Sequence, residues 1–126
     1  MKIMVINCGS SSLKFQIFDI DDKKNNVMAK GLVEEIGRET SKLHYKNEKM
    51  KKDEEITKEI EAKDHTEALE EVAKLLIDSK IGIFKDKIQV DAVGHRVVHG
   101  GEKFSKSAFI TEGVKEVIQE CFDIAP

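Results

Sequence analysis

The sequence predicts an α/β domain built on a mixed β-sheet, and two observations support this prediction. First, three apolar segments at residues 3–6, 13–20 and 27–36 open the chain. They are joined by short polar turns, which indicates an antiparallel three-strand meander. Second, an amphipathic helical pattern is followed by a further apolar segment at residues 90–98. A length of 126 residues agrees with one domain.

The opening strands follow the patterns of a sheet that is buried on one or both faces. Residues 3–6 are apolar throughout, as is typical of a strand buried on both faces. Residues 41–46 predict a short further strand. Alternation along residues 13–20 and 27–36 assigns side chains to opposite faces. One face of the second strand receives Leu13, Phe15 and Ile17, and the other receives Lys14 and Gln16. In the third strand, Val27, Ala29, Gly31 and Val33 lie opposite Met28, Lys30, Leu32 and Glu34.

The middle of the chain is highly charged and then becomes helical. Residues 46–64 carry 13 charged side chains of both signs, which favours a solvated loop or edge hairpin over a binding tail. Asp64 and Glu67 then form a capping-box pattern ahead of apolar residues at helical spacing, which predicts a helix over residues 66–79.

Three segments are expected after this helix. Residues 90–98 predict a strand that runs into a pair of glycines, and residues 104–110 are irregular or a short strand. A second helix is predicted from five apolar residues at helical spacing, Val114, Val117, Ile118, Cys121 and Phe122.

Composition excludes several classes of protein. There are 21 basic and 24 acidic residues, a net charge of −3, so no general attraction to nucleic acid or anionic membranes is expected. The apolar runs are shorter than the roughly 20 residues of a membrane span, and the N-terminus lacks the pattern of a signal peptide. Cys8 and Cys121 make no disulfide framework. We expect a cytoplasmic protein.

The first motif with chemical potential is Asn-Cys-Gly-Ser-Ser-Ser-Leu-Lys at residues 7–14, between two predicted strands. Backbone N–H groups in a tight turn can converge on a phosphate, and glycine lets the backbone approach it closely. Serine hydroxyls and Lys14 add further donors. The pattern is not a P-loop, and taken alone it is also compatible with a plain hairpin turn.

The second motif surrounds Arg96, at residues 92–102. In a strand, Arg96 and Val98 share one face, so a planar guanidinium lies beside a small apolar side chain. Such a pair suits a ligand with an anionic head and a short alkyl tail. The alternative is that Arg96 pairs with an internal carboxylate and Val98 belongs to the core.

Two other chemistries are disfavoured. His95 and His99 have the spacing of a helical metal pair, but the segment reads as a strand, so we expect no zinc site. Cys8 lies at the end of an apolar strand and reads as a packed side chain rather than a nucleophile.

Together the two motifs resemble the two signatures of the acetate kinases. Residues 6–15 resemble the opening signature, and Gly-His-Arg-Val-Val-His-Gly-Gly within residues 93–101 resembles the second. Residues 121–126 resemble the stretch just before the family's Leu-His-Asn-Pro segment. The resemblance implies a ribonuclease-H-like (actin-like ATPase) domain of the acetate and sugar kinase, Hsp70 and actin superfamily.

The resemblance also implies an activity, ligands and residue roles. The family reaction converts ATP and acetate to ADP and acetyl phosphate, with Mg²⁺ as the metal cofactor. Asn7 matches the position at the Mg²⁺–phosphate site. The first phosphate loop is matched by Gly9, Ser10, Ser12 and Lys14. Arg96 matches the arginine that holds the substrate carboxylate or the transferring phosphoryl group, and Val98 matches a wall of the acyl methyl pocket.

Proteins of this family are longer than 126 residues and have two lobes. We therefore expect residues 1–126 to form an N-terminal lobe, truncated before the rest of the enzyme. It would contain no catalytic residue and be inactive alone, and the full-length enzyme would be a homodimer. The alternatives are a kinase for propionate or another short-chain carboxylate, a stand-alone anion-binding actin-like module, and a structural domain in which the serine loop is a plain hairpin.

Overall fold

The computed structural model describes residues 1–51, 53–85, 87–97 and 122–124. Within them, β1 (Lys2–Cys8), β2 (Leu13–Ile20) and β3 (Asn25–Glu34) form the predicted antiparallel meander.

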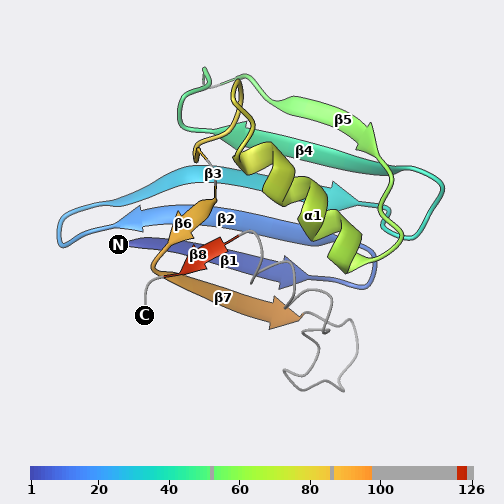
Figure 1. Cartoon of the computed structure of the whole chain (residues 1–126), viewed down its shortest axis with the longest axis horizontal. Coiled ribbons are helices and arrows are strands. Elements are labelled where there is room, and N and C mark those ends of the chain that lie inside the picture. Colours follow the sequence, from blue (N-terminus) through green and yellow to red (C-terminus); the bar gives the residue numbers. More distant parts are fainter. Residues whose placement is uncertain (52, 86, 98–121, 125–126) are drawn as a thin grey trace.

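A hairpin and a single strand complete the large sheet. The hairpin of β4 (Ser41–Asn47) and β5 (Ile56–Ile60) extends one edge, and β7 (Ala92–Val97) pairs in parallel with β1 at the other. The order β5-β4-β3-β2-β1-β7 confirms the expected mixed sheet, and the charged segment is an edge hairpin (Figure 1).

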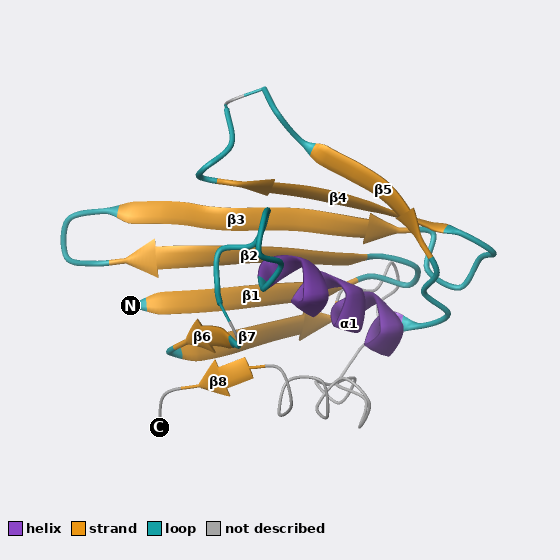
Figure 2. Ribbon diagram, turned by 45° about the horizontal axis from the view of Figure 1, so that its top comes forward, coloured by secondary structure: helices purple, strands orange, loops and turns teal. Residues whose placement is uncertain are grey.

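Helix α1 (His65–Leu76) lies across one face of the sheet (Figures 1 and 2). The Asp64 carboxylate accepts a hydrogen bond from the Glu67 N–H at 2.9 Å, and Glu67 Oε1 accepts one from the Lys63 N–H at 2.8 Å. The predicted cap is therefore confirmed. The helix ends earlier than predicted because Asp78 Oδ1 accepts from the N–H groups of Lys80 and Ile81, and the resulting turn replaces further helical bonds.

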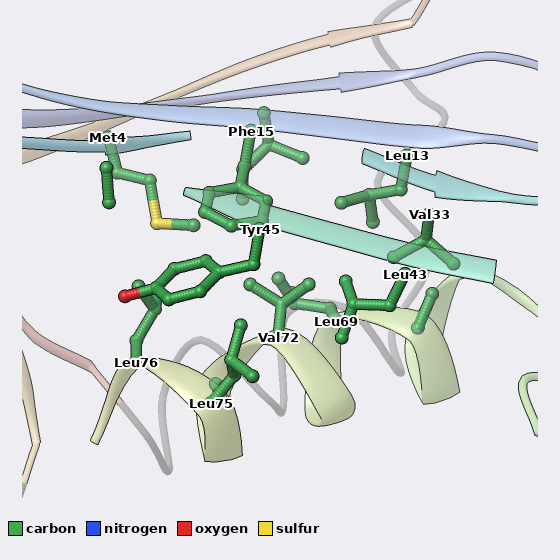
Figure 3. Close-up of a cluster of buried hydrophobic side chains, with 14 of the residues drawn as sticks. Met4, Leu13, Phe15, Val33, Leu43, Tyr45, Leu69, Val72, Leu75 and Leu76 are labelled. Atoms are coloured by element: carbon green, nitrogen blue, oxygen red, sulfur yellow. The ribbon is translucent and has the colours of Figure 1, made fainter. Parts of the chain in front are cut away.

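The hydrophobic core lies between α1 and the sheet. Figure 3 shows side chains of β1 to β4 meeting those of the helix, and the rings of Phe15 and Tyr45 stack with their centroids 6.4 Å apart. Each fully buried large apolar side chain contributes about 1.5–3 kcal/mol to folding. The largest fully buried side chains include Met4, Ile6, Leu13, Phe15, Ile17, Leu43, Tyr45, Leu69 and Leu76.

The predicted alternation is confirmed in β2 and is wrong in part of β3. A bulge shifts the register so that Ile17 pairs with Ala29 while Phe18 pairs with Val27, which leaves Met28 as the extra residue. Met28 and Ala29 are consequently both buried, and Val27 is 39% exposed. Strand β1 also differs from expectation, because Met4, Ile6 and Cys8 are buried whereas the alternate residues are half-buried.

The apolar segment predicted as one strand at residues 90–98 is divided between two sheets. Its start belongs to β6 (Ile88–Val90), which pairs in parallel with β8 (Phe122–Ile124), and β7 belongs to the large sheet. Asp91 makes the break, because its N–H donates to the Lys2 carbonyl and its carboxylate accepts from the Lys2 N–H, both at 2.7 Å.

The prediction of a second helix is wrong at its last residue, since Phe122 begins β8. Pairing with β6 supplies the backbone hydrogen-bond partners that a helix would otherwise provide. The rest of that predicted helix and the segment 104–110 lie outside the described residues.

Candidate functional site

The loop of residues 9–12 joins β1 to β2 and is held in a tight turn. The Gly9 N–H donates to the Ser12 carbonyl at 2.9 Å. A Cβ atom at Gly9 would lie 2.7 Å from Ser12 Oγ, so a larger residue would displace the serine hydroxyl. Glycine therefore leaves room for the Ser12 hydroxyl in its observed position.

The carbonyl groups of the loop are bound by the protein. His65, the first residue of α1, places Nε2 at 2.8 Å from the Gly9 carbonyl oxygen and 3.0 Å from that of Ser12. The Ile36 N–H donates to the Ser11 carbonyl at 2.9 Å. Figure 2 shows the loop beside the N-terminal end of the helix.

The loop's donors are left available. Within the described part of the chain, the backbone N–H groups of Ser10, Ser11 and Ser12 have no protein acceptor. Ser10 and Ser11 are exposed, and Ser12 is half-buried. Clustered N–H groups and hydroxyls without internal acceptors are the arrangement that binds an anion such as phosphate.

Three predicted site residues form one row across the sheet, next to this loop. Asn7 of β1 pairs in register with Lys14 of β2 on one side and with Arg96 of β7 on the other. The double hydrogen bond between Asp91 and Lys2 sets this parallel register at the start of the two strands.

Asn7 and Lys14 of this row lie on the face of the sheet that is opposite α1. Lys14 is exposed and Asn7 is half-buried, whereas their chain neighbours Leu13 and Cys8 are buried toward the helix. For Arg96 the structure gives the backbone position in the row. Val98 lies outside the described residues. Two motifs that are far apart in the sequence thus lie on neighbouring strands at the β7 edge of the sheet.

The open face also has a hollow of about 480 Å³ on the other side of Lys14, over β3 and β4. Lys30 and His44 line it together with two carboxylates, Glu34 and Glu55. Glu34 Oε1 lies 2.8 Å from His44 Nε2. The hollow is lined by Lys14 but includes neither Asn7 nor the serine loop, so it adjoins the residues suited to phosphate and shares Lys14 with them.

Cys8 is a packed side chain, as predicted. It is 7% exposed, and burial raises the pKa of its thiol to about 11. The thiol is therefore protonated at neutral pH and is a poor nucleophile.

One side chain of this site, the amide of Asn7, suits a magnesium ion as a ligand. Among the described residues, no cluster of three or more His, Cys, Asp or Glu side chains could hold a metal. The half-buried amide of Asn7 makes no side-chain hydrogen bond within that part of the chain. An amide oxygen is a hard ligand, and Mg²⁺ commonly takes few protein ligands alongside waters and phosphate oxygens. Asn7 is thus a suitable single ligand.

One residue of this site, His65, was not predicted from the sequence. Its position directly after the helix cap gives no indication of a contact with residues more than 50 positions earlier. The partner carbonyls become apparent once the helix is docked on the sheet.

The one helix among the described residues, α1, is too short and too polar to cross a membrane.

The arrangement of the sheet and helix defines a ribonuclease-H-like, actin-like domain. Solved structures support this fold. An acetate kinase from Porphyromonas gingivalis aligns with a TM-score of 0.68 and 42% identity, covering 95% of this chain and 29% of that one. A propionate kinase from Francisella tularensis aligns with a TM-score of 0.55 and 33% identity, covering 95% and 28%.

The chain belongs to the acetokinase family, which matches residues 2–126. It is 48% identical over 126 residues to the acetate kinase of Methanosarcina acetivorans. It is 51% identical over 128 aligned positions to that of Thermoanaerobacterium thermosaccharolyticum. In both comparisons all of this chain is covered, and it spans 30% of the relative's length.

Proposed function

We propose that residues 1–126 form the N-terminal lobe of an acetate kinase, a longer enzyme that transfers the γ-phosphoryl group of ATP to acetate. The products are acetyl phosphate and ADP. The observation that carries the proposal is that Asn7, Lys14 and Arg96 lie in one row of neighbouring strands, next to the serine loop. Family membership supports the same reaction.

The serine loop and Lys14 are proposed to bind the phosphates of ATP. Gly9 permits the tight turn, and Ser10 and Ser12 offer hydroxyls beside N–H groups that have no protein acceptor among the described residues. The exposed Lys14 ammonium supplies positive charge at the end of the loop. Phosphoryl transfer depends mainly on such positioning and charge neutralisation.

Asn7 is proposed to hold Mg²⁺ through its amide oxygen, directly or through water. When bound, the ion neutralises phosphate charge during transfer. Asn7 lies between Lys14 and Arg96 in the row, so a metal there would sit between the proposed nucleotide and acid sites.

Arg96 is proposed to hold the carboxylate of acetate or the transferring phosphoryl group, and Val98 to form a wall of the methyl pocket. A guanidinium offers two parallel N–H donors to either anion. We assign no catalytic residue within residues 1–126, and we expect these residues alone to give no turnover. We also propose a cytoplasmic homodimer as the state of the full-length protein.

Trapping acetyl phosphate with hydroxylamine in the full-length protein tests the proposal. The wild type should form product from ATP, acetate and Mg²⁺. Arg96→Ala should lower kcat/KM by at least about 100-fold, because a charged substrate contact is lost. Arg38→Ala is the matched control, since Arg38 is exposed in the β3–β4 turn and is not part of the row. Equal activity of both variants, or binding of MgATP without phosphoryl transfer, would contradict the proposed reaction. The second outcome would favour an anion-binding module.

A propionate kinase is the second candidate, because a propionate kinase is among the structural neighbours. The same assay with acetate and propionate separates the two. The proposal predicts a higher kcat/KM for acetate, and a higher value for propionate would reassign the substrate.

A further inference from the structure

His65 joins three segments at one end of the sheet. It is the first residue of α1, and its ring contacts the carbonyl groups at both ends of the serine loop, Gly9 and Ser12. The β3–β4 turn reaches the same loop through the hydrogen bond from the Ile36 N–H to the Ser11 carbonyl. The loop is therefore tied to the rest of the fold through its carbonyls.

The chemistry of this contact assigns the ring's hydrogen. Carbonyl oxygens accept hydrogen bonds and cannot donate them, so Nε2 of His65 must carry a hydrogen shared between the two oxygens. The single Nε2–H group of His65 thus holds the two ends of the loop together.

The helix that carries His65 is firmly packed. α1 is anchored by its buried residues, and the Asp64 carboxylate caps its first turn by accepting from the Glu67 N–H. Six residues of the helix are buried: Ala68, Leu69, Val72, Ala73, Leu75 and Leu76. A ring fixed to such a helix can restrain a loop made of glycine and serine residues.

We propose that His65 is a positioning residue for nucleotide binding: by binding the carbonyls of Gly9 and Ser12, it orients the serine loop so that its N–H groups face the phosphates of MgATP. This inference rests on the proposed function. The cost of ordering the loop is met when the helix docks rather than when the nucleotide binds, so the nucleotide binds more tightly.

The experiment compares three variants of the full-length protein. His65→Ala removes the donor. His65→Gln keeps an N–H near the position of Nε2. Glu67→Ala is the matched control, because it removes the acceptor of the Lys63 N–H at the same helix end without touching the loop.

We expect His65→Ala to raise the KM for MgATP about tenfold, while the KM for acetate changes less than about twofold. His65→Gln should restore the KM for MgATP to within about threefold of the wild type, and Glu67→Ala should leave it within about twofold. The proposal is overturned if His65→Ala leaves the KM for MgATP unchanged, if Glu67→Ala raises it equally, or if His65→Gln gives no rescue.

Amide hydrogen exchange tests the clamp independently of catalysis. The Gly9 and Ile36 N–H groups donate to the Ser12 and Ser11 carbonyls, so their exchange reports the order of the loop. Both should exchange at least about fivefold faster in His65→Ala than in Glu67→Ala. If the wild type does not phosphorylate acetate but this difference is seen, the proposed function fails and the clamp stands. Equal exchange in the two variants refutes the clamp, whatever the activity.

Discussion

The two faces of the six-stranded sheet use the same strands for different purposes. On the helix side, Leu13 and Cys8 are buried, whereas their neighbours Lys14 and Asn7 lie on the open side. Because successive side chains of a strand point to opposite faces, folding and chemistry can be encoded in alternate residues. Substitutions on the helix side should therefore change stability, and those on the open side should change ligand binding.

The largest effect is expected for a core residue of the helix side. Phe15→Ala removes a fully buried ring that stacks on Tyr45, and it should lower the free energy of unfolding by about 3–5 kcal/mol. The next residue, Gln16, is half-buried on the open face. Gln16→Ala should change stability by less than about 0.5 kcal/mol. Urea denaturation measures both, and similar losses would show that the two faces do not differ as described.

A smaller free-energy change, with the opposite pattern, is expected for Asn7→Ala. Removing the proposed metal ligand should lower kcat/KM about 100-fold, equivalent to about 2.7 kcal/mol of transition-state stabilisation. Stability should stay within about 0.5 kcal/mol of the wild type. The control is Asn26→Ala, which loses a surface hydrogen bond to Glu48 at the far end of the sheet. Activity losses of equal size in both variants would argue against a role for Asn7.

The smallest effect concerns Cys8, which adjoins Asn7 but faces the helix. Since the pKa of its thiol is raised to about 11, its alkylation rate in a Cys121→Ser variant should rise about tenfold per pH unit from pH 8 to 10. A pKa raised by folding also means that stability is complete below the unfolded pKa and falls as the pH rises through the folded value. A labelling rate that levels off near pH 9 would show that the thiol is exposed.

The contrast between the faces could be predicted where it depends on local pattern. Alternation in residues 13–20 gave the two faces of β2, and the spacing of Asp64 and Glu67 gave the helix start. Each depends on neighbours within a few residues. The phosphate-loop prediction also came from adjacent residues, and it stays a prediction.

The features that were missed depend on contacts between distant segments. The bulge at Met28 is a property of the pairing with β2, and the break at Asp91 depends on Lys2. The contact of His65 with Gly9 requires the helix to be docked on the sheet. The sequence showed the two motifs separately. The register that places Asn7 beside Arg96 depends on the pairing of β1 with β7.

The central claim is that the open side of the sheet, next to the serine loop, binds the nucleotide. Calorimetric titration of MgATP into the full-length protein tests it most directly, with Lys14→Ala compared against Lys24→Ala in the distant β2–β3 turn. The account predicts that Lys14→Ala weakens binding at least about tenfold, or 1.4 kcal/mol, at an unchanged unfolding midpoint, while Lys24→Ala binds as the wild type does. Wild-type affinity in a folded Lys14→Ala protein would contradict it.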